Sequence, residues 1–434
     1  VQRGVSMNMS RHTCPSINAR LGLALALALA LAPGGCAQPV CAPPDYRDPD
    51  CRVLEENERA RLRSSAGAEL RMQAPDADAT SSWDALGLLR EERPGEVTAR
   101  VAALGDFALS IEPAEQPADA LELTLTNVDP RLVVELTRAD DDALIAVLPA
   151  DGPSLRRHAR VPLTEGALWL RGALACPDRF RLVAVGDVQD GVRHFERILD
   201  HLELERAAAE EAGEPLLGLL LLGDLTDRAR DDEFRALREL LARAPVPVAA
   251  TPGNHDIFRA FPPSYNEIFG PGSYSFELCG ARVAMLDSGS GMIADSVEAR
   301  LDELIARDRE RAPFLLVGTH IPAHAGLTGN GWTREDQAER LLTALAEAKV
   351  DILLTGHVHA LREYPAVPTP YGPVRELIAG TAGAAQGSGQ LDFGYVRLSL
   401  ARAPASMEAC YVEVPPPGER ETSSDRPIPS CAAP

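Results

Sequence analysis

The feature that most constrains this 434-residue chain is a series of five apolar segments, each followed within a few residues by side chains able to ligate a metal. The segments suit buried strands, and helical apolar spacing occurs between several of them. Strands that alternate with helices predict an α/β fold. In chain order, the segments and the side chains that follow are 181–185 with Asp187 and Gln189, 216–222 with Asp224, 246–250 with Asn254, His255 and Asp256, 314–317 with His320, and 352–354 with His357 and His359.

These polar side chains all follow the carboxyl end of an expected strand, which is the edge where open α/β sheets bind ligands. Their spacing along the chain is repeatedly about one strand-helix-strand unit, roughly 30 or more residues. A glycine precedes most of the motifs, and glycine lets the backbone turn sharply and approach an ion. Carboxylate, amide oxygen and imidazole together suit zinc, manganese, iron or nickel. The pattern therefore predicts one shared metal site.

Taken in order, the motifs GD-x-Q at 186, GD-x-x-D at 223, GNHD at 253, GTH at 318 and GHVH at 356 resemble those of the calcineurin-like metallophosphoesterase family. Each motif alone is a weak signal, but the whole series in this order is specific. The resemblance covers about residues 180–414. It implies a two-sheet αββα sandwich that hydrolyses a small phosphorylated substrate with two divalent or trivalent transition metal ions, Mn, Fe, Zn or Ni.

Carried over residue by residue, the resemblance implies seven metal ligands. The family usually has His where this chain has Gln189, whose amide oxygen can still ligate. The purple acid phosphatase branch has a metal-binding Tyr just after the second motif Asp, and Leu225 to Asp227 offer none, so no tyrosinate colour is expected. The implied ligands are Asp187, Gln189 and His359 for one ion, Asn254, His320 and His357 for the other, and Asp224 as a bridge between both.

The resemblance also implies a mechanism in which a metal-bridging hydroxide attacks phosphorus and His255 protonates the leaving oxygen. Asp256 or Asp224 is expected to orient the ring of His255. No Ser or Cys stands in a nucleophile-elbow setting, which favours direct attack over a covalent intermediate. His324 is left open between a structural and a substrate-contacting role. The other Asp and His residues outside the ligand set are expected to be structural or to have no role, namely Asp190, His194, His201, Asp227, His12 and His158.

The formal net charge of -21 disfavours polyanionic partners. No Lys/Arg cluster interleaved with aromatic residues occurs, so sequence-specific nucleic acid binding is not expected. A small phosphorylated substrate is compatible with the charge, because bound metal ions reverse the local field. Two alternatives remain open: a phosphodiesterase or nucleotide hydrolase, and a catalytically inactive surface binding module, which only the departure at Gln189 supports.

An export signal is expected at the N-terminus, where Arg20 precedes an unbroken apolar run over 21–32 that is too short to span a bilayer as a mature helix. The small residues before Cys36 resemble the box at which bacterial lipoproteins are cleaved and acylated, although Pro33 stands where Leu is usual. Ala37 carries no inner-membrane retention signal, which predicts an outer-membrane lipoprotein facing the periplasm or the cell surface. The alternative is an ordinary cleaved signal with Cys36 as a disulfide partner.

Composition and periodicity, together with the two resemblances, predict five parts of the chain. Residues 95–177 contain alternating runs separated by turn signals, such as 121–125, 132–136 and 144–148, and these predict a small all-β sandwich-like domain. Cysteines 41, 51, 176, 279, 410 and 431 lack zinc-site spacing and are expected to be disulfide staples or buried thiols. The five parts are a lipoprotein-type signal peptide at 1–36, a flexible tether at 37–94, the β domain at 95–177, the metallophosphoesterase domain at 178–414 and a Pro-rich tail at 415–434.

Overall fold

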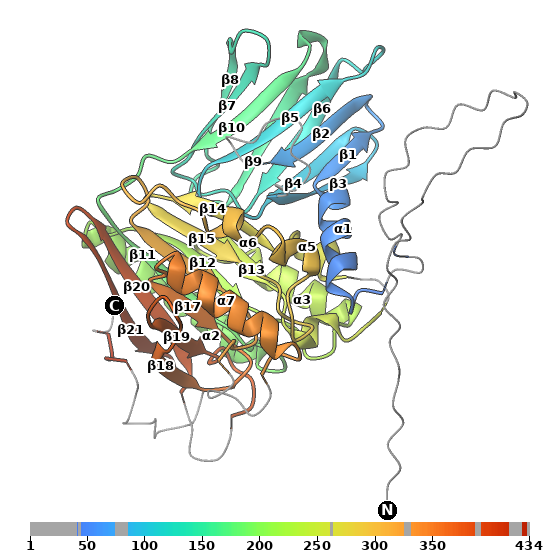
Figure 1. Ribbon diagram of the computed structural model, residues 1–434. Coiled ribbons are helices and arrows are strands. Elements are labelled where there is room, and N and C mark those ends of the chain that lie inside the picture. The colour runs from blue at the N-terminus through green and yellow to red at the C-terminus, as the bar shows by residue number, and fades with distance from the viewer. Residues whose placement is uncertain are drawn as a thin grey trace, which may run out of the picture. The chain divides into compact units, whose positions relative to one another are not determined.

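Two β-sandwiches make up the part of the chain that the computed structural model describes, which comprises residues 41, 45–73, 86–260, 264–324, 331–386, 392–415 and 428–431 (Figure 1). The N-terminal sandwich is all β, and the second combines two sheets with helices. The expected signal peptide and Cys36 lie outside the described residues. Within those residues, no helix is both long enough and apolar enough to cross a membrane.

The N-terminal sandwich consists of a six-stranded and a four-stranded sheet. The predicted runs 121–125, 132–136 and 144–148 fall in β6, β7 and β8, which confirms the all-β prediction. The first sheet has the order β1 (Arg61–Ser64), β2 (Ala68–Gln73), β5 (Phe107–Pro113), β10 (Leu168–Ala173), β7 (Val133–Arg138) and β8 (Leu144–Leu148). The second has the order β3 (Gly87–Arg93), β4 (Glu96–Val101), β6 (Ala120–Thr126) and β9 (Arg156–Pro162).

The prediction of a flexible tether over 37–94 is wrong for residues 49–73 and 87–93. These residues form helix α1 (Pro49–Arg59) and strands β1, β2 and β3. Arg52 of α1 is 1% exposed and donates to Asp287 at 2.6 Å. The polar composition of this segment suggested solvation, but its buried side chains Arg52 and Glu56 bond to partners more than two hundred residues away, which composition does not reveal.

The second sandwich consists of a five-stranded and a six-stranded sheet whose central strands are mostly parallel. The first sheet has the order β13 (Val248–Thr251), β12 (Leu216–Leu222), β11 (Arg179–Val185), β20 (Gly394–Arg402) and β21 (Ala405–Glu413). The second has the order β14 (Tyr274–Leu278), β15 (Ala281–Met285), β16 (Phe314–Gly318), β17 (Ile352–Thr355), β19 (Val374–Ala379) and β18 (Leu361–Val367).

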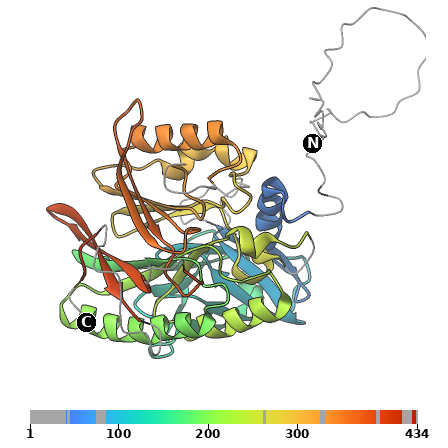
Figure 2. The ribbon, with the colours of Figure 1, turned by 90° about the horizontal axis from the view of Figure 1, so that it is seen from below.

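Helices cover both outer faces of this sandwich, as Figure 2 shows for α2 (Val192–Glu211) and α7 (Glu335–Glu347). Apolar residues of α2 and α3 (Asp231–Leu241) form one buried cluster with β11, β12 and β13. Those of α5 (Asp295–Glu298), α6 (Leu301–Ile305) and α7 form another with the second sheet. The short α4 (Tyr265–Phe269) joins the first cluster. This is the αββα architecture that the resemblance implied.

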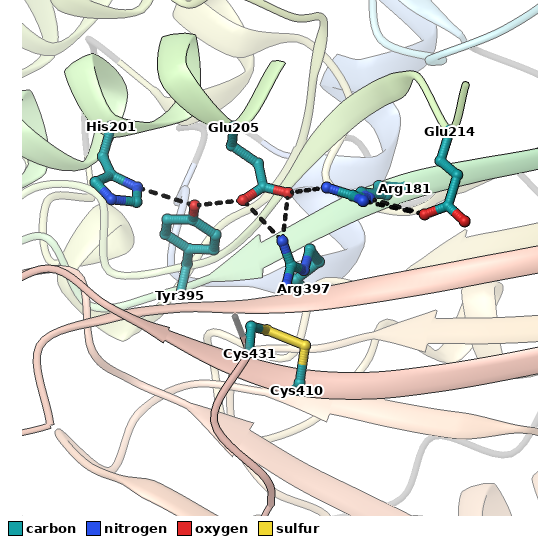
Figure 3. The surroundings of a disulfide bond; sticks show 8 residues. All are labelled: Arg181, His201, Glu205, Glu214, Tyr395, Arg397, Cys410 and Cys431. Atoms are coloured by element: carbon teal, nitrogen blue, oxygen red, sulfur yellow. Dashed lines mark hydrogen bonds and ion pairs between the residues drawn. A yellow bond between two sulfur atoms is a disulfide. The ribbon is translucent and has the colours of Figure 1, made fainter. Parts of the chain in front are cut away.

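Helix α2 is fixed to its sheet by a buried carboxylate as well as by its apolar stripe. Glu205 is fully buried and accepts hydrogen bonds from Arg181 on β11 and Arg397 on β20, both at 2.8 Å (Figure 3). Tyr395 donates to the same carboxylate at 3.3 Å. Each charge therefore has an opposite partner, which offsets the cost of burial. His201, expected to be structural, contacts the Tyr395 hydroxyl at 3.1 Å.

Disulfides tie distant parts of the fold together, so the cysteines are staples and not the buried thiols that the sequence had left open. Cys410 on β21 bonds Cys431 and fastens the C-terminal residues to the sheet (Figure 3). Cys176 bonds Cys279, which links the segment after β10 to the β14–β15 turn. Cys41 and Cys51 are also disulfide-bonded. The two sandwiches additionally share one hydrophobic core, which contains Leu109 and Leu123 as well as Leu182 and Leu316.

Candidate metal centre

All seven predicted ligands meet where the strands of both α/β sheets end. They follow β11, β12 and β13 in one sheet and β16 and β17 in the other. The Asn254 Oδ1 atom lies 3.1 Å from His320 Nε2 and 3.0 Å from His357 Nδ1. Gln189 Nε2 lies 2.9 Å from Asp224 Oδ2 and 3.2 Å from His359 Nε2. His359 Nε2 is also 3.6 Å from an oxygen of Asp187. The strand-end pattern thus describes one site.

The acidic and imidazole ligand atoms form two overlapping sets. Asp224, His320 and His357 form one set, and Asp187, Asp224 and His359 form the other. Within each set, the potential ligand atoms lie within 4.8 Å of one another. Asp224 is the shared member, so its carboxylate belongs to both sets. This arrangement fits a pair of neighbouring cations bridged by one carboxylate.

The backbone of the centre is held in an unfavourable conformation at four of the seven ligands. The φ angles are 65° at Asp187, 43° at Gln189, 52° at Asp224 and 69° at His357. Left-handed backbone is uncommon for non-glycine residues, and such residues concentrate where a site requires them. Gly223, directly before Asp224, also has a positive φ of 84°, and a Cβ atom there would lie 2.7 Å from His320 Nδ1.

Backbone carbonyls orient two of the histidines toward the centre. His320 Nδ1 lies 2.8 Å from the Leu222 carbonyl oxygen, and His359 Nδ1 lies 2.7 Å from that of Ala385. When Nδ1 donates to a carbonyl, the neutral ring carries its lone pair on Nε2, which faces the site. Gln189 directs its amide at Asp224 and His359, and a half-turn of the amide presents its oxygen there. These donors fit divalent transition metal ions.

Burial and opposite charge shift the pKa values of the central groups. Burial raises the pKa of Asp187 well above its ordinary value. Burial also acts to raise the pKa of Asp224, but the charge and hydrogen bond of His320 outweigh it and hold that pKa low. Burial acts to lower the pKa of His320, and Asp224 outweighs it and raises the pKa to about 9. Asp187, Asp224 and His320 thus form a buried cluster in which the carboxylate of Asp224 favours positive charge.

His255 lies beside the centre, and its orienting partner differs from the prediction. Its backbone N–H donates to Asp224 Oδ1 at 2.8 Å, but its ring turns to Asp227. His255 Nδ1 is 2.6 Å from the Asp227 carbonyl oxygen and 3.7 Å from its carboxylate. Neither Asp256 nor Asp224 orients the ring, and Asp227, expected to have only a structural role, does so. The ring leaves Nε2 available.

Asp256 links the loop that follows β12 to the loop that follows β13, and it does not face a reacting group. It is 2% exposed, and its oxygens accept from the backbone N–H groups of Leu225, Thr226 and Gly253 at 2.8–3.1 Å. The Thr226 hydroxyl donates to it at 2.9 Å. These bonds occupy the carboxylate, so the predicted catalytic role of Asp256 does not agree with its surroundings.

Three supporting residues were not assigned from the sequence. The Ser288 hydroxyl accepts from the backbone N–H groups of His320 and Ile321 at 3.0 and 2.9 Å. Asp287 next to it pairs with Arg52 of α1. Buried Glu376 accepts from the N–H groups of the loop after His320. Asp287 and Ser288 had a sequence signal, their place just after β15, whereas the role of Glu376 depends on contacts between distant segments.

The remaining histidines and Asp190 lie apart from the ligand sets. His194 is buried against Phe393, with ring centroids 5.0 Å apart. His158 contacts Thr124 in the N-terminal sandwich. His324 stacks on Tyr364 at 4.3 Å, which leaves both of its open roles standing. Asp190 is exposed, and His12 lies outside the described residues.

Comparison with known proteins agrees with this geometry. Residues 180–361 match the sequence profile of the calcineurin-like phosphoesterases. This matched segment, which is less than half of the chain, is similar to that family. Members of this family depend on metal ions, and residues 180–361 contain all seven candidate ligands.

Individual relatives are similar over part of their length. Purple acid phosphatase 22 of Arabidopsis thaliana is 30% identical over 186 residues, or 37% of this chain and 42% of that protein. A probable cyclic nucleotide phosphodiesterase of Fibrobacter succinogenes is 24% identical, over 42% of this chain and 74% of that protein. The structure of purple acid phosphatase PPD1 from yellow lupin (Lupinus luteus) seeds aligns with a TM-score of 0.45 at 15% identity, over 72% of this chain and 70% of that chain. The chain spans less than half the length of the plant relatives that it matches in sequence.

Proposed function

We propose that this chain is a metallophosphoesterase that hydrolyses small phosphate esters with two metal ions. The observation that carries the proposal is the sharing of Asp224 between two sets of ligand atoms. Asp187, Gln189 and His359 would hold one ion, and Asn254, His320 and His357 the other. Two ions, when bound, would stabilise charge on the phosphoryl oxygens and activate water for in-line displacement.

The chain itself supplies the proton for the leaving group. His255 Nδ1 is engaged by Asp227, so Nε2 is the nitrogen free to donate. The carboxylate of Asp227 lies 3.7 Å from Nδ1, and the bond from the His255 backbone to Asp224 fixes the residue beside the ligands. An inactive binding module would not need this arrangement, and its presence favours the enzyme.

Metal removal and a substrate panel test this proposal. Protein stripped with a chelator should lose phosphate release, and Mn, Fe, Zn or Ni added back singly should restore it at about two ions per chain. The panel should include both monoesters and diesters. A phosphodiesterase or nucleotide hydrolase is the alternative function, and the similarity to a probable cyclic nucleotide phosphodiesterase supports it. Metal-loaded protein that cleaves no member of the panel would instead indicate an inactive binding module.

We also propose that the protein is exported and anchored through lipid on Cys36. The apolar run and the small residues before Cys36 support acylation, and the disulfides suit an oxidising compartment. In a bacterial host, the parent should partition into the detergent phase and Cys36→Ser into the aqueous phase. Equal partitioning of both proteins would contradict a lipid anchor at Cys36.

A further inference from the structure

Phe258 is an exposed aromatic side chain that packs directly on the proposed proton donor. It follows the Asn254–Ile257 turn and is 51% exposed, although large apolar side chains are usually covered. Its ring centroid lies 4.5 Å from that of His255, at an interplanar angle of 53°. One side of the ring therefore contacts the imidazole while much of the rest faces solvent.

The position of Phe258 relates it to the leaving group. His255 Nδ1 is engaged by Asp227, so a leaving oxygen that takes a proton must approach Nε2. A hydrogen bond to Nε2 is about 3 Å long, and Phe258 contacts the same ring. The group attached to that oxygen thus comes within reach of the exposed part of Phe258.

We infer that Phe258 is a stacking platform that makes the site prefer esters whose leaving group carries a planar aromatic ring, of the aryl or nucleoside type. This inference rests on the proposed phosphoesterase function and on His255 as its proton donor. Aromatic rings gain from offset or tilted stacking beyond the burial of their area. An aliphatic group of the same size would bury similar area without that gain.

A matched pair of substrates separates stacking from size and from leaving-group basicity. Benzyl phosphate and cyclohexylmethyl phosphate both release a primary alkoxide of similar bulk, and only the first has a planar ring. In metal-loaded protein, Phe258→Ala should raise KM for the benzyl ester roughly two- to tenfold and change the other little. Phe258→Trp should keep the preference. Tyr371→Ala removes an equally exposed aromatic ring in the turn between β18 and β19, and should change neither ester.

Binding gives a readout that does not require turnover. Benzylphosphonate should bind the parent more tightly than cyclohexylmethylphosphonate in calorimetry, and Phe258→Ala should abolish that difference. An equal loss of kcat for both esters, with no change in their relative KM, would mean that Phe258 only supports His255 and would overturn the platform. Equal binding of the two phosphonates by a parent that cleaves other phosphate esters would overturn the platform alone, whereas a parent that cleaves no phosphate ester would contradict the proposed function and the inference that rests on it.

Discussion

Asp224 is the residue on which the metal centre depends most, because both sets of ligand atoms include it. Its carboxylate also accepts from the His255 backbone and pairs with His320 at 3.2 Å. In the proposed two-metal centre, replacing the charge by an amide would remove the negative group between the two cations, and no single other ligand is placed to balance both.

We therefore expect Asp224→Asn to lower bound metal below two ions per chain and nearly to abolish phosphate release. The matched control is Asp190→Asn, which makes the same change at an exposed carboxylate nearby and should keep both properties. Metal analysis by mass spectrometry beside a phosphate-release assay provides the measurement. Full activity in Asp224→Asn would rule out the shared-carboxylate centre.

His255 should affect rate in a way that depends on the ester. A general acid contributes roughly 10² to 10⁴-fold when the departing oxygen is strongly basic and much less for nitrophenolate. His255→Ala should keep near-normal metal content, and its rate should decline more steeply than the parent's as leaving-group pKa rises. Parallel slopes, or loss of metal from the variant, would contradict the proton-donor role.

At the scale of elements, α1 is the segment that composition assigned to a flexible tether although it is part of the fold. Its Arg52 pairs with Asp287 just after β15, and its Glu56 accepts from the N–H of Gly272 just before β14 at 2.8 Å. Glu56 is 3% exposed, and burial raises its pKa from an ordinary 4.5 to about 8. The helix therefore carries a carboxyl group that stays protonated near neutral pH in the folded protein.

The raised pKa of Glu56 predicts a pH dependence of stability with a definite sign. Folded Glu56 keeps its proton to about pH 8, whereas the unfolded chain releases it near 4.5. The folded state thus binds more protons between these values, and its contribution to stability is lost as pH rises through them. In denaturant titrations from pH 5 to 8, Glu56→Gln should lose less stability than the parent. Glu58→Gln, on the exposed side of α1, should follow the parent; identical profiles for all three proteins would refute the raised pKa.

At the scale of the whole molecule, the two sandwiches are joined by a shared core and by Cys176–Cys279. Strand β10 ends at Ala173 and strand β11 begins at Arg179. The predicted domain boundary at 178 lies between them and stays a prediction. The disulfide closes a chain separation of 103 residues, against 21 for Cys410–Cys431. In the chain-entropy account, a disulfide that closes a longer loop removes more conformational entropy from the unfolded chain.

Removing each disulfide by paired Cys→Ser substitution should therefore have unequal effects. Loss of Cys176–Cys279 should lower the free energy of unfolding by about 2–4 kcal/mol, and by about 1 kcal/mol more than loss of Cys410–Cys431. Equilibrium denaturation of the two variants and the parent measures both differences. A larger loss for the shorter loop would show that local packing of the C-terminal residues outweighs chain entropy.

Local pattern alone determined much of this protein. Strand and helix periodicities and short motifs involve neighbours in sequence, so the strand ends, the stripes of α2 and α3 and the order of the seven ligands could be predicted. Tertiary structure decided what depends on distant partners. It made α1 part of the fold through Arg52 and Asp287. It also placed Asp227 where it orients the His255 ring, and Asp256 where its carboxylate bonds the backbone of the ligand loops. A buried polar side chain acquires its role from the partner that the fold brings to it, and neither composition nor spacing encodes that partner.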